Sequence, residues 1–232
     1  MENEHIFEQR PISAERIKEF AWDAMKDKWG IGALIVFLNF IFTVVVPAIP
    51  EAFLEEGSIG LLIWQLITVF TSAGFLFGFY ACFLDNARKV PSSVARFFTA
   101  FRDFKFLLKV FATEFLQYFF LFWWTLLLIV PGIMKLYSYS MTELILVDHP
   151  EYSPLQAITA SKEMMYGHRM QLFYLQVAFS LWILLCIVTF GIAGLWVSPY
   201  YFTAKSKLYL EIKDRQEKKA GLDEIVPADP IK

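Results

Sequence analysis

Residues 132–147 read GIMKLYSYSMTELILV, and whether this stretch crosses a membrane decides the fold of the chain. It follows a long apolar run, but it contains Lys135 and Glu143, whose long side chains we expect to reach the two membrane interfaces. A helix of this length extends about 24 Å at about 1.5 Å per residue, against a hydrocarbon core of about 30 Å. Length alone therefore leaves a re-entrant or interfacial segment open.

The distribution of Lys and Arg among the loops resolves this ambiguity. Basic residues are frequent before residue 29, between 88 and 109 and from 205 onward, whereas 51–60 and 189–194 contain none. Short loops rich in Lys and Arg stay in the cytoplasm. All the basic segments fall on one side only if 132–147 crosses, so the charge pattern predicts six spans with both termini cytoplasmic.

Composition favours a membrane protein as well. The chain is 57% hydrophobic without Gly, whereas a soluble domain is roughly 45–50% apolar with Gly counted. We predict an all-α, polytopic bundle in the cell membrane, with six transmembrane helices and amphipathic interfacial helices on the cytoplasmic side. The expected parts are a cytoplasmic amphipathic N-terminal helix (1–30), a membrane domain (31–212) with spans near 31–50, 61–84, 106–130, 132–147, 170–190 and 192–210, and a flexible cytoplasmic tail (213–232).

Three amphipathic segments precede pairs of predicted spans, and we expect them to lie along the cytoplasmic membrane surface. The first begins at Ser13, the second lies near 94–105, and the third, near 154–168, follows the potential cap Ser153. Apolar residues of the first share one face: Ile17, Phe20, Ala21, Ala24 and Met25. A short helix followed by a hairpin thus recurs loosely over 13–84, 94–147 and 154–210.

Glycine and proline mark two further features of the predicted spans. Gly74 and Gly78 are spaced for the close approach of another helix. Pro131 and Gly132 predict a tight turn between the third and fourth spans.

Four polar residues deep inside predicted spans form a candidate intramembrane site: Asn39, Glu114, Gln117 and Gln176. Glu114 lies roughly 13 Å from the cytoplasmic edge, and Gln117 follows one turn later on the same face. Polar groups at such depth cost free energy unless they are paired. They indicate either a site that handles protons or cations, or polar contacts that join helices, and both interpretations stay open.

Basic residues at the cytoplasmic ends of the spans are candidates for contacts with lipid headgroups: Arg96, Arg102, Lys105, His168 and Arg169. In the Phe-rich segment, Arg96, Arg102 and Lys105 would each favour anionic lipid by about 1 kcal/mol. The sequence contains no Walker loop, dinucleotide fingerprint, zincin His-Glu pair or nucleophile elbow, so we expect no enzymatic activity, catalytic residue, metal or cofactor. Membrane lipids or another membrane protein are the expected partners, and nucleic acid is not.

Several short motifs follow one another between Pro131 and Leu210. They are YSM at 139–141, SPLQAI at 153–158, GH at 167–168, TFGI at 189–192 and PYY at 199–201. In this order the stretch resembles bacterial integral membrane proteins grouped as domain of unknown function 975. Gln156 stands where that family commonly has Glu, and Tyr166 where it commonly has Lys. The resemblance implies a six-helix bacterial membrane protein and supplies no accepted activity.

Two functions from different classes are compatible with these features. The first is a non-enzymatic protein that binds lipid or a partner at the inner leaflet through its amphipathic helices. The second is a small transporter or permease that uses Glu114 and the neighbouring amides. A membrane enzyme would need a metal or a nucleophile that the sequence does not offer.

Overall fold

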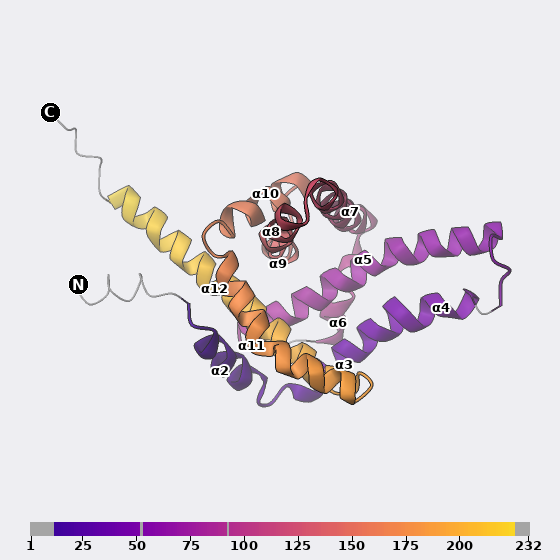
Figure 1. Ribbon diagram of the computed structural model, residues 1–232, viewed down its shortest axis with the longest axis horizontal. Helices are drawn as coiled ribbons and strands as arrows, with labels where there is room; N and C mark the ends of the chain where they lie inside the picture. The colour runs from indigo at the N-terminus through magenta and orange to yellow at the C-terminus, as the bar shows by residue number, and fades with distance from the viewer. Residues whose placement is uncertain (1–11, 52, 92, 226–232) are drawn as a thin grey trace.

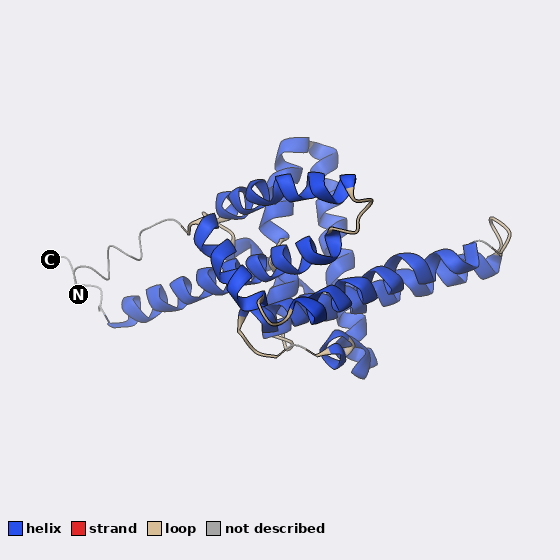
Figure 2. Cartoon of the chain, turned by 90° about the horizontal axis from the view of Figure 1, so that it is seen from below, coloured by secondary structure: helices blue, strands red, loops and turns tan. Residues whose placement is uncertain are grey.

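The computed structural model describes residues 12–51, 53–91 and 93–225, and every regular element in these ranges is a helix (Figure 2). The predicted all-helical fold is therefore confirmed. Residues 1–11 of the predicted N-terminal segment and 226–232 of the predicted tail lie outside the described ranges.

The chain forms three successive units, each a short helix followed by a hairpin. The first unit is α2 (Ala14–Met25), a continuous helical run of α3 (Trp29–Phe40), η1 (Ile41–Val45) and α4 (Val46–Glu51), and α5 (Ile59–Ala87). The second is α6 (Val94–Phe97), η2 (Thr99–Arg102), α7 (Phe104–Leu127), α8 (Ile129–Tyr139) and α9 (Thr142–Asp148). The third is α10 (Pro154–Met164), α11 (Arg169–Val188) and α12 (Gly194–Ile225). This order agrees with the three loose repeats in the sequence.

The three hairpins diverge from a common core instead of running side by side. Figure 1 looks nearly along α7 and α8, while α5 lies across the view and α11 lies against α12 on a diagonal. The ends at which each hairpin turns are therefore far from one another, and the core lies where the hairpins begin.

Four helical segments are long and apolar enough to cross a membrane: Trp29–Pro50, Ile59–Ala87, Phe104–Leu127 and Arg169–Val188. In the apolar 18-residue stretch of each, only 11% to 22% of the residues are buried by the rest of the chain. Apolar surface on this scale is typical of helices that lipid covers. The structure thus agrees with a membrane protein, and the number of six spans stays a prediction.

The segment 132–147 does not form one helix. The chain leaves α7 at Leu128, which is extended, three residues before the predicted turn at Pro131. Pro131 instead occupies the first turn of α8, where its missing N–H group costs no hydrogen bond. A second break at Ser140 and Met141 separates α8 from α9.

The two short helices nevertheless run back along α7. Gly132 packs against Thr125, because a Cβ atom at Gly132 would lie 2.9 Å from the Cα atom of Thr125. At the other end, the Lys109 ammonium donates to the Pro150 carbonyl. Thr125 and Lys109 are about 24 Å apart along the axis of α7, so α8 and α9 return the chain to the level at which α7 begins.

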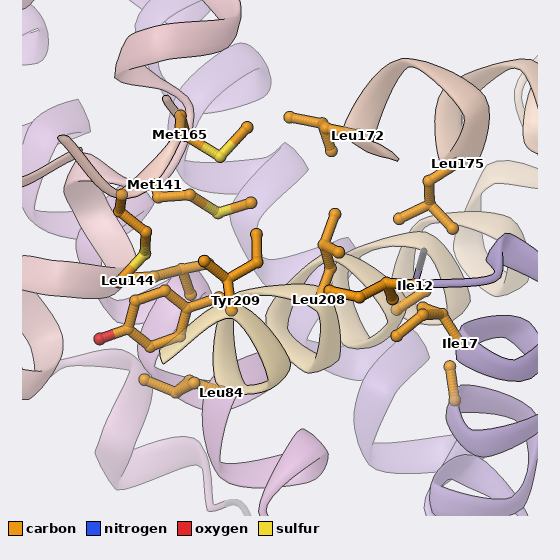
Figure 3. Close-up of a cluster of buried hydrophobic side chains, with 14 of the residues drawn as sticks. Ile12, Ile17, Leu84, Met141, Leu144, Met165, Leu172, Leu175, Leu208 and Tyr209 are labelled. Atoms are coloured by element: carbon orange, nitrogen blue, oxygen red, sulfur yellow. The ribbon is translucent and has the colours of Figure 1, made fainter. Parts of the chain in front are cut away.

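Helix α12 passes through the largest cluster of buried apolar side chains (Figure 3). Leu208 and Tyr209 of α12 meet Met141 and Leu144 from the second unit and Ile17 from the first. The apolar face predicted for the first amphipathic segment is present, but Ile17, Ala21, Ala24 and Met25 are buried inside the protein and not in lipid.

The predicted interfacial helix near 94–105 is broken into α6 and η2. Its Phe97 is fully buried, because this segment packs against Gly74 and Gly78 of α5. A Cβ atom at Gly78 would lie 1.8 Å from the Phe97 carbonyl oxygen. The two glycines therefore do allow a close approach, but to this short segment and not to a long helix.

The third amphipathic segment forms α10, which begins with a capping box. The Gln156 N–H donates to Ser153 Oγ at 3.4 Å, and the Ser153 N–H donates to Gln156 Oε1 at 2.8 Å. Gly167 follows with φ +80°, the left-handed conformation that favours glycine. At the other end of the third unit α12 continues to Ile225, so residues 213–225, predicted as a flexible tail, are helical.

Candidate functional site

A polar cavity of about 220 Å³ lies where the three hairpins meet. Helices α5, α7, α8, α9, α11 and α12 all contribute to its wall. Three of the four polar residues predicted to form an intramembrane layer line it: Glu114, Gln117 and Gln176. Asn39 lies on α3 and is not among the residues that line this cavity.

Helix α7 contributes Glu114 and Gln117 to the cavity wall. Glu114 and Gln117 are three residues apart, so they lie on one face of α7. Val110 and Leu107, about one and two turns before Glu114, pack that end of α7 against α5, α9 and α10. The apolar contacts fix the helix, and the next turns then direct the polar pair toward the neighbouring hairpins.

Two charged residues of the cavity were not predicted as members of the site. Glu143 was expected to reach an interface, but its side chain is buried, with 5% of the residue exposed, and it lines the cavity. The break at Ser140 and Met141 ends α8 early, so Glu143 falls in the first turn of α9, inside the protein. Lys205 lies within the sixth predicted span and is 7% exposed. A charge inside a predicted span is a signal of function, and it could have identified both residues.

Hydrogen bonds order one side of the cavity. The Tyr137 hydroxyl donates to Gln176 Oε1 at 2.5 Å, and Gln176 Nε2 donates to the Tyr201 hydroxyl at 3.2 Å. Lys205 Nζ donates to the Tyr80 hydroxyl at 3.1 Å and lies 4.8 Å from the centre of the Tyr80 ring. The amide and the ammonium group are therefore held in place by tyrosines.

The acidic side of the cavity is not satisfied in the same way. Among the described residues, neither carboxylate oxygen of Glu143 has a hydrogen-bond partner, and the same holds for Oε1 of Glu114 and Oε1 of Gln117. Buried polar atoms in native proteins are nearly always paired, with protein, water or a ligand. The cavity therefore has a surplus of hydrogen-bond acceptors.

A cluster of charges at the end of α9 fixes the helices that build the cavity. Asp148 accepts from Arg88 at the end of α5 and, at 2.8 and 3.0 Å, from Tyr209 and Lys213 of α12. Burial raises the pKa of Asp148, but the hydrogen bonds from Lys213, Tyr209 and Arg88 more than offset this, so its pKa lies below the ordinary value. The ionised Asp148 joins α5, α9 and α12, which carry Tyr80, Glu143 and Lys205.

The five residues predicted to contact lipid headgroups differ in their exposure and in their hydrogen-bond partners. Arg96 is paired with Asp85 at 3.0 Å, and His168 Nδ1 lies 2.8 Å from Gln171 Oε1. Arg169 is half-buried, and its Nε atom has no hydrogen-bond partner among the described residues. Arg102 and Lys105 are exposed at the beginning of α7.

Metal-binding chemistry finds no support in the described ranges, where no group of three or more His, Cys, Asp or Glu side chains is arranged to hold an ion. His149 and Glu151, which belong to one loop, instead pair with each other at 3.0 Å.

Comparison with known proteins extends the resemblance noted in the sequence. No match to the chain was found among curated proteins or among solved structures. A family model covers residues 125–216, which include Glu143, Asp148, Gln176 and Lys205 but not Glu114. Over these residues the chain is similar to the family described as Protein of unknown function (DUF975), the same family that its sequence motifs resemble.

Proposed function

We propose that this chain is a non-enzymatic protein of the cell membrane, with both termini in the cytoplasm, that binds a small polar solute in its cavity as a carrier does. The observation that carries the proposal is Glu143, a buried carboxylate that faces the cavity without a hydrogen-bond partner among the described residues. Burying a polar group without a partner is unfavourable, so a solute that supplies donors gains binding energy there.

The position of the cavity supports this proposal. It lies between helices of three different hairpins, so movement of one hairpin relative to another changes access to it. Carriers place solute sites between helical units and build them from interrupted helices. The break between α8 and α9 puts Glu143 at such an interruption.

Thermal unfolding of the purified protein tests the proposal, because a solute that binds the native state raises the unfolding midpoint. Methylammonium, acetate and acetamide represent cationic, anionic and neutral solutes. We expect one class to raise the midpoint of the wild type but not of Glu143→Gln. Glu163→Gln makes the same change at an exposed position of α10 and should respond like the wild type. A wild-type midpoint that none of the three solutes changes would refute the proposal.

Binding of anionic lipid is a second candidate function, because Arg102 and Lys105 flank Phe104, whose side chain is exposed. An apolar side chain between two basic ones suits a membrane surface. The double substitution Arg102→Ala/Lys105→Ala should reduce the anionic lipid retained in native mass spectrometry. Equal lipid retention by the variant and the wild type would exclude this surface.

A further inference from the structure

The charges of the cavity restrict the solute that it accepts. Glu114 and Glu143 each supply one negative charge when ionised, and Lys205 supplies one positive charge. They are the Asp, Glu, Lys and Arg residues of the described cavity wall, so the formal charge of the site is −1 when all three groups are ionised. One monovalent cation neutralises it.

Hydrogen bonding points to the same class of ligand. In the part of the chain that the structure describes, the buried cavity atoms without hydrogen-bond partners are Glu143 Oε1 and Oε2, Glu114 Oε1 and Gln117 Oε1, and all four are acceptors. Lys205, a strong donor of the wall, already donates to Tyr80. A ligand that fills this site must therefore bring donors, which an ammonium group does with up to three N–H bonds.

The aromatic part of the wall favours an organic ammonium over a metal ion. Tyr80, Tyr118, Tyr137 and Tyr139 all line the cavity. An ammonium group is attracted to the face of an aromatic ring, and the Lys205 ammonium at 4.8 Å from the Tyr80 ring centre already makes this contact. The size is restrictive too, because about 220 Å³ is below the about 300–1,000 Å³ of pockets for drug-sized ligands.

We infer that the cavity is a site for a small monovalent organic ammonium ion, with Glu143 and Glu114 as its acceptors, Tyr rings beside it, and Lys205 limiting the bound charge to one. This inference rests on the proposed function and names the class of solute for the same site. Glu143 is the principal ligand, because it is the more deeply buried carboxylate and both of its oxygens lack partners among the described residues.

Calorimetric titration of the purified full chain with methylammonium chloride tests the inference. We expect binding that Glu143→Gln weakens by about ten-fold or more, the loss expected for one charge-assisted hydrogen bond. Glu163→Gln, outside the cavity, should bind like the wild type. Potassium chloride, at the same ionic strength, should bind more weakly than methylammonium.

Lys205→Met should change which solute the site prefers, and misfolding would only reduce binding of both solutes. Without the ammonium of Lys205 the site carries a formal charge of −2, so the variant should prefer the dication of 1,3-diaminopropane to methylammonium, whereas the wild type should prefer methylammonium. Tighter binding of acetate or acetamide than of methylammonium would overturn the ammonium inference and leave a solute site in place. Equal binding of potassium and methylammonium would also overturn it. If none of these solutes binds, the proposed function fails as well.

Discussion

Among the described glycines, Gly78 is the one at which an added Cβ atom would come closest to a neighbouring atom. Its missing side chain lets the Phe97 carbonyl approach α5, and a Cβ atom there would lie 1.8 Å from that oxygen. The contact involves backbone on both sides, so no rotamer change relieves it. Gly78→Ala should lower the free energy of unfolding at the upper end of the about 1–3 kcal/mol typical of overpacking. Thermal or denaturant unfolding in detergent measures this.

Gly60→Ala is the matched control, because Gly60 lies in the same helix and has no atom within 4 Å of the position that a Cβ would occupy. Alanine is favoured over glycine in a helix by about 1 kcal/mol, so this substitution should leave stability unchanged or increase it. Equal destabilisation by the two substitutions would show that the Phe97 contact does not limit α5.

Single residues also show how far the candidate site could be predicted. Glu114 and Gln117 were identified because both lie deep in a long apolar segment, where depth can be counted along one helix. Counting along one continuous helix predicts that Glu143 reaches an interface, but the structure interrupts that helix at Ser140. No local property of the sequence YSYSMTEL requires that break, at which the Met141 N–H donates to Ser161 Oγ of α10 and the Ser161 hydroxyl donates to the Ser138 carbonyl.

The capping box of α10 is compatible with Gln156, which stands where the family that the chain resembles commonly has Glu. Both side chains can accept from the Ser153 N–H, so the contact at 2.8 Å needs an oxygen and not a charge. Gln156→Glu should therefore keep stability within about 0.5 kcal/mol. Ser153→Ala removes the cap itself and should cost about 0.5–2 kcal/mol. Unfolding midpoints that rank the two variants in the opposite order would contradict this account.

The cluster around Asp148 joins three helices, and its effect depends on pH. The pKa of Asp148 is lower in the folded chain than in the unfolded chain, so the ionised form stabilises the fold. This stabilisation is complete well above the ordinary Asp pKa of about 3.9 and is lost as pH falls below it and through the folded pKa. Asp148→Asn should cost about 1.5–3 kcal/mol at neutral pH, the range for hydrogen bonds to a charged group.

The measurement compares unfolding midpoints of the wild type and Asp148→Asn from pH 7 to pH 3. The difference between them should be constant down to about pH 5 and then shrink. Asp214→Asn on α12 is the control, because it makes the same change at an exposed position. Asp103→Asn would be unsuitable, because Asp103 caps α7. A difference that grows toward low pH would exclude the proposed role of the Asp148 carboxylate.

Among the elements, those with a local signal were predicted best. Ser153 and Pro154 predicted where α10 begins, and the apolar periodicity of residues 17–25 predicted the buried face of α2. The segments that failed depend on tertiary contacts. In the broken 94–105 segment, Phe97 and Phe101 lie against Gly78 and Gly74 of α5, which come 19 and 27 residues earlier in the chain.

In the whole molecule, basic residues from the loops with many Lys and Arg contact residues of other such loops or of α9. Lys28 donates to the Val90 carbonyl at 2.9 Å, Arg16 pairs with Glu211 at 2.8 Å, and Lys213 pairs with Asp148 at 3.0 Å. These contacts join residues of the three basic segments, and Asp148 at the end of α9, near the beginnings of the hairpins and not at their turns. Positively charged residues rarely cross a membrane, so the core should face the cytoplasm and the hairpin turns the outside.

Cysteine labelling of intact cells tests this orientation. The background variant carries Cys82→Ala and Cys186→Ala. Into it we introduce Glu56→Cys or Ile192→Cys, each at a hairpin turn, or Lys162→Cys on α10 beside the core. A maleimide that cannot cross membranes should label the first two in intact cells and the third only after permeabilisation. If Lys162 is cytoplasmic, the chain must return across the membrane between Leu127 and Asp148. The helices α8 and α9, which run back along α7, are the segment that would make this crossing. Labelling at Lys162 in intact cells would mean that it does not return, and the six-span prediction would then be wrong.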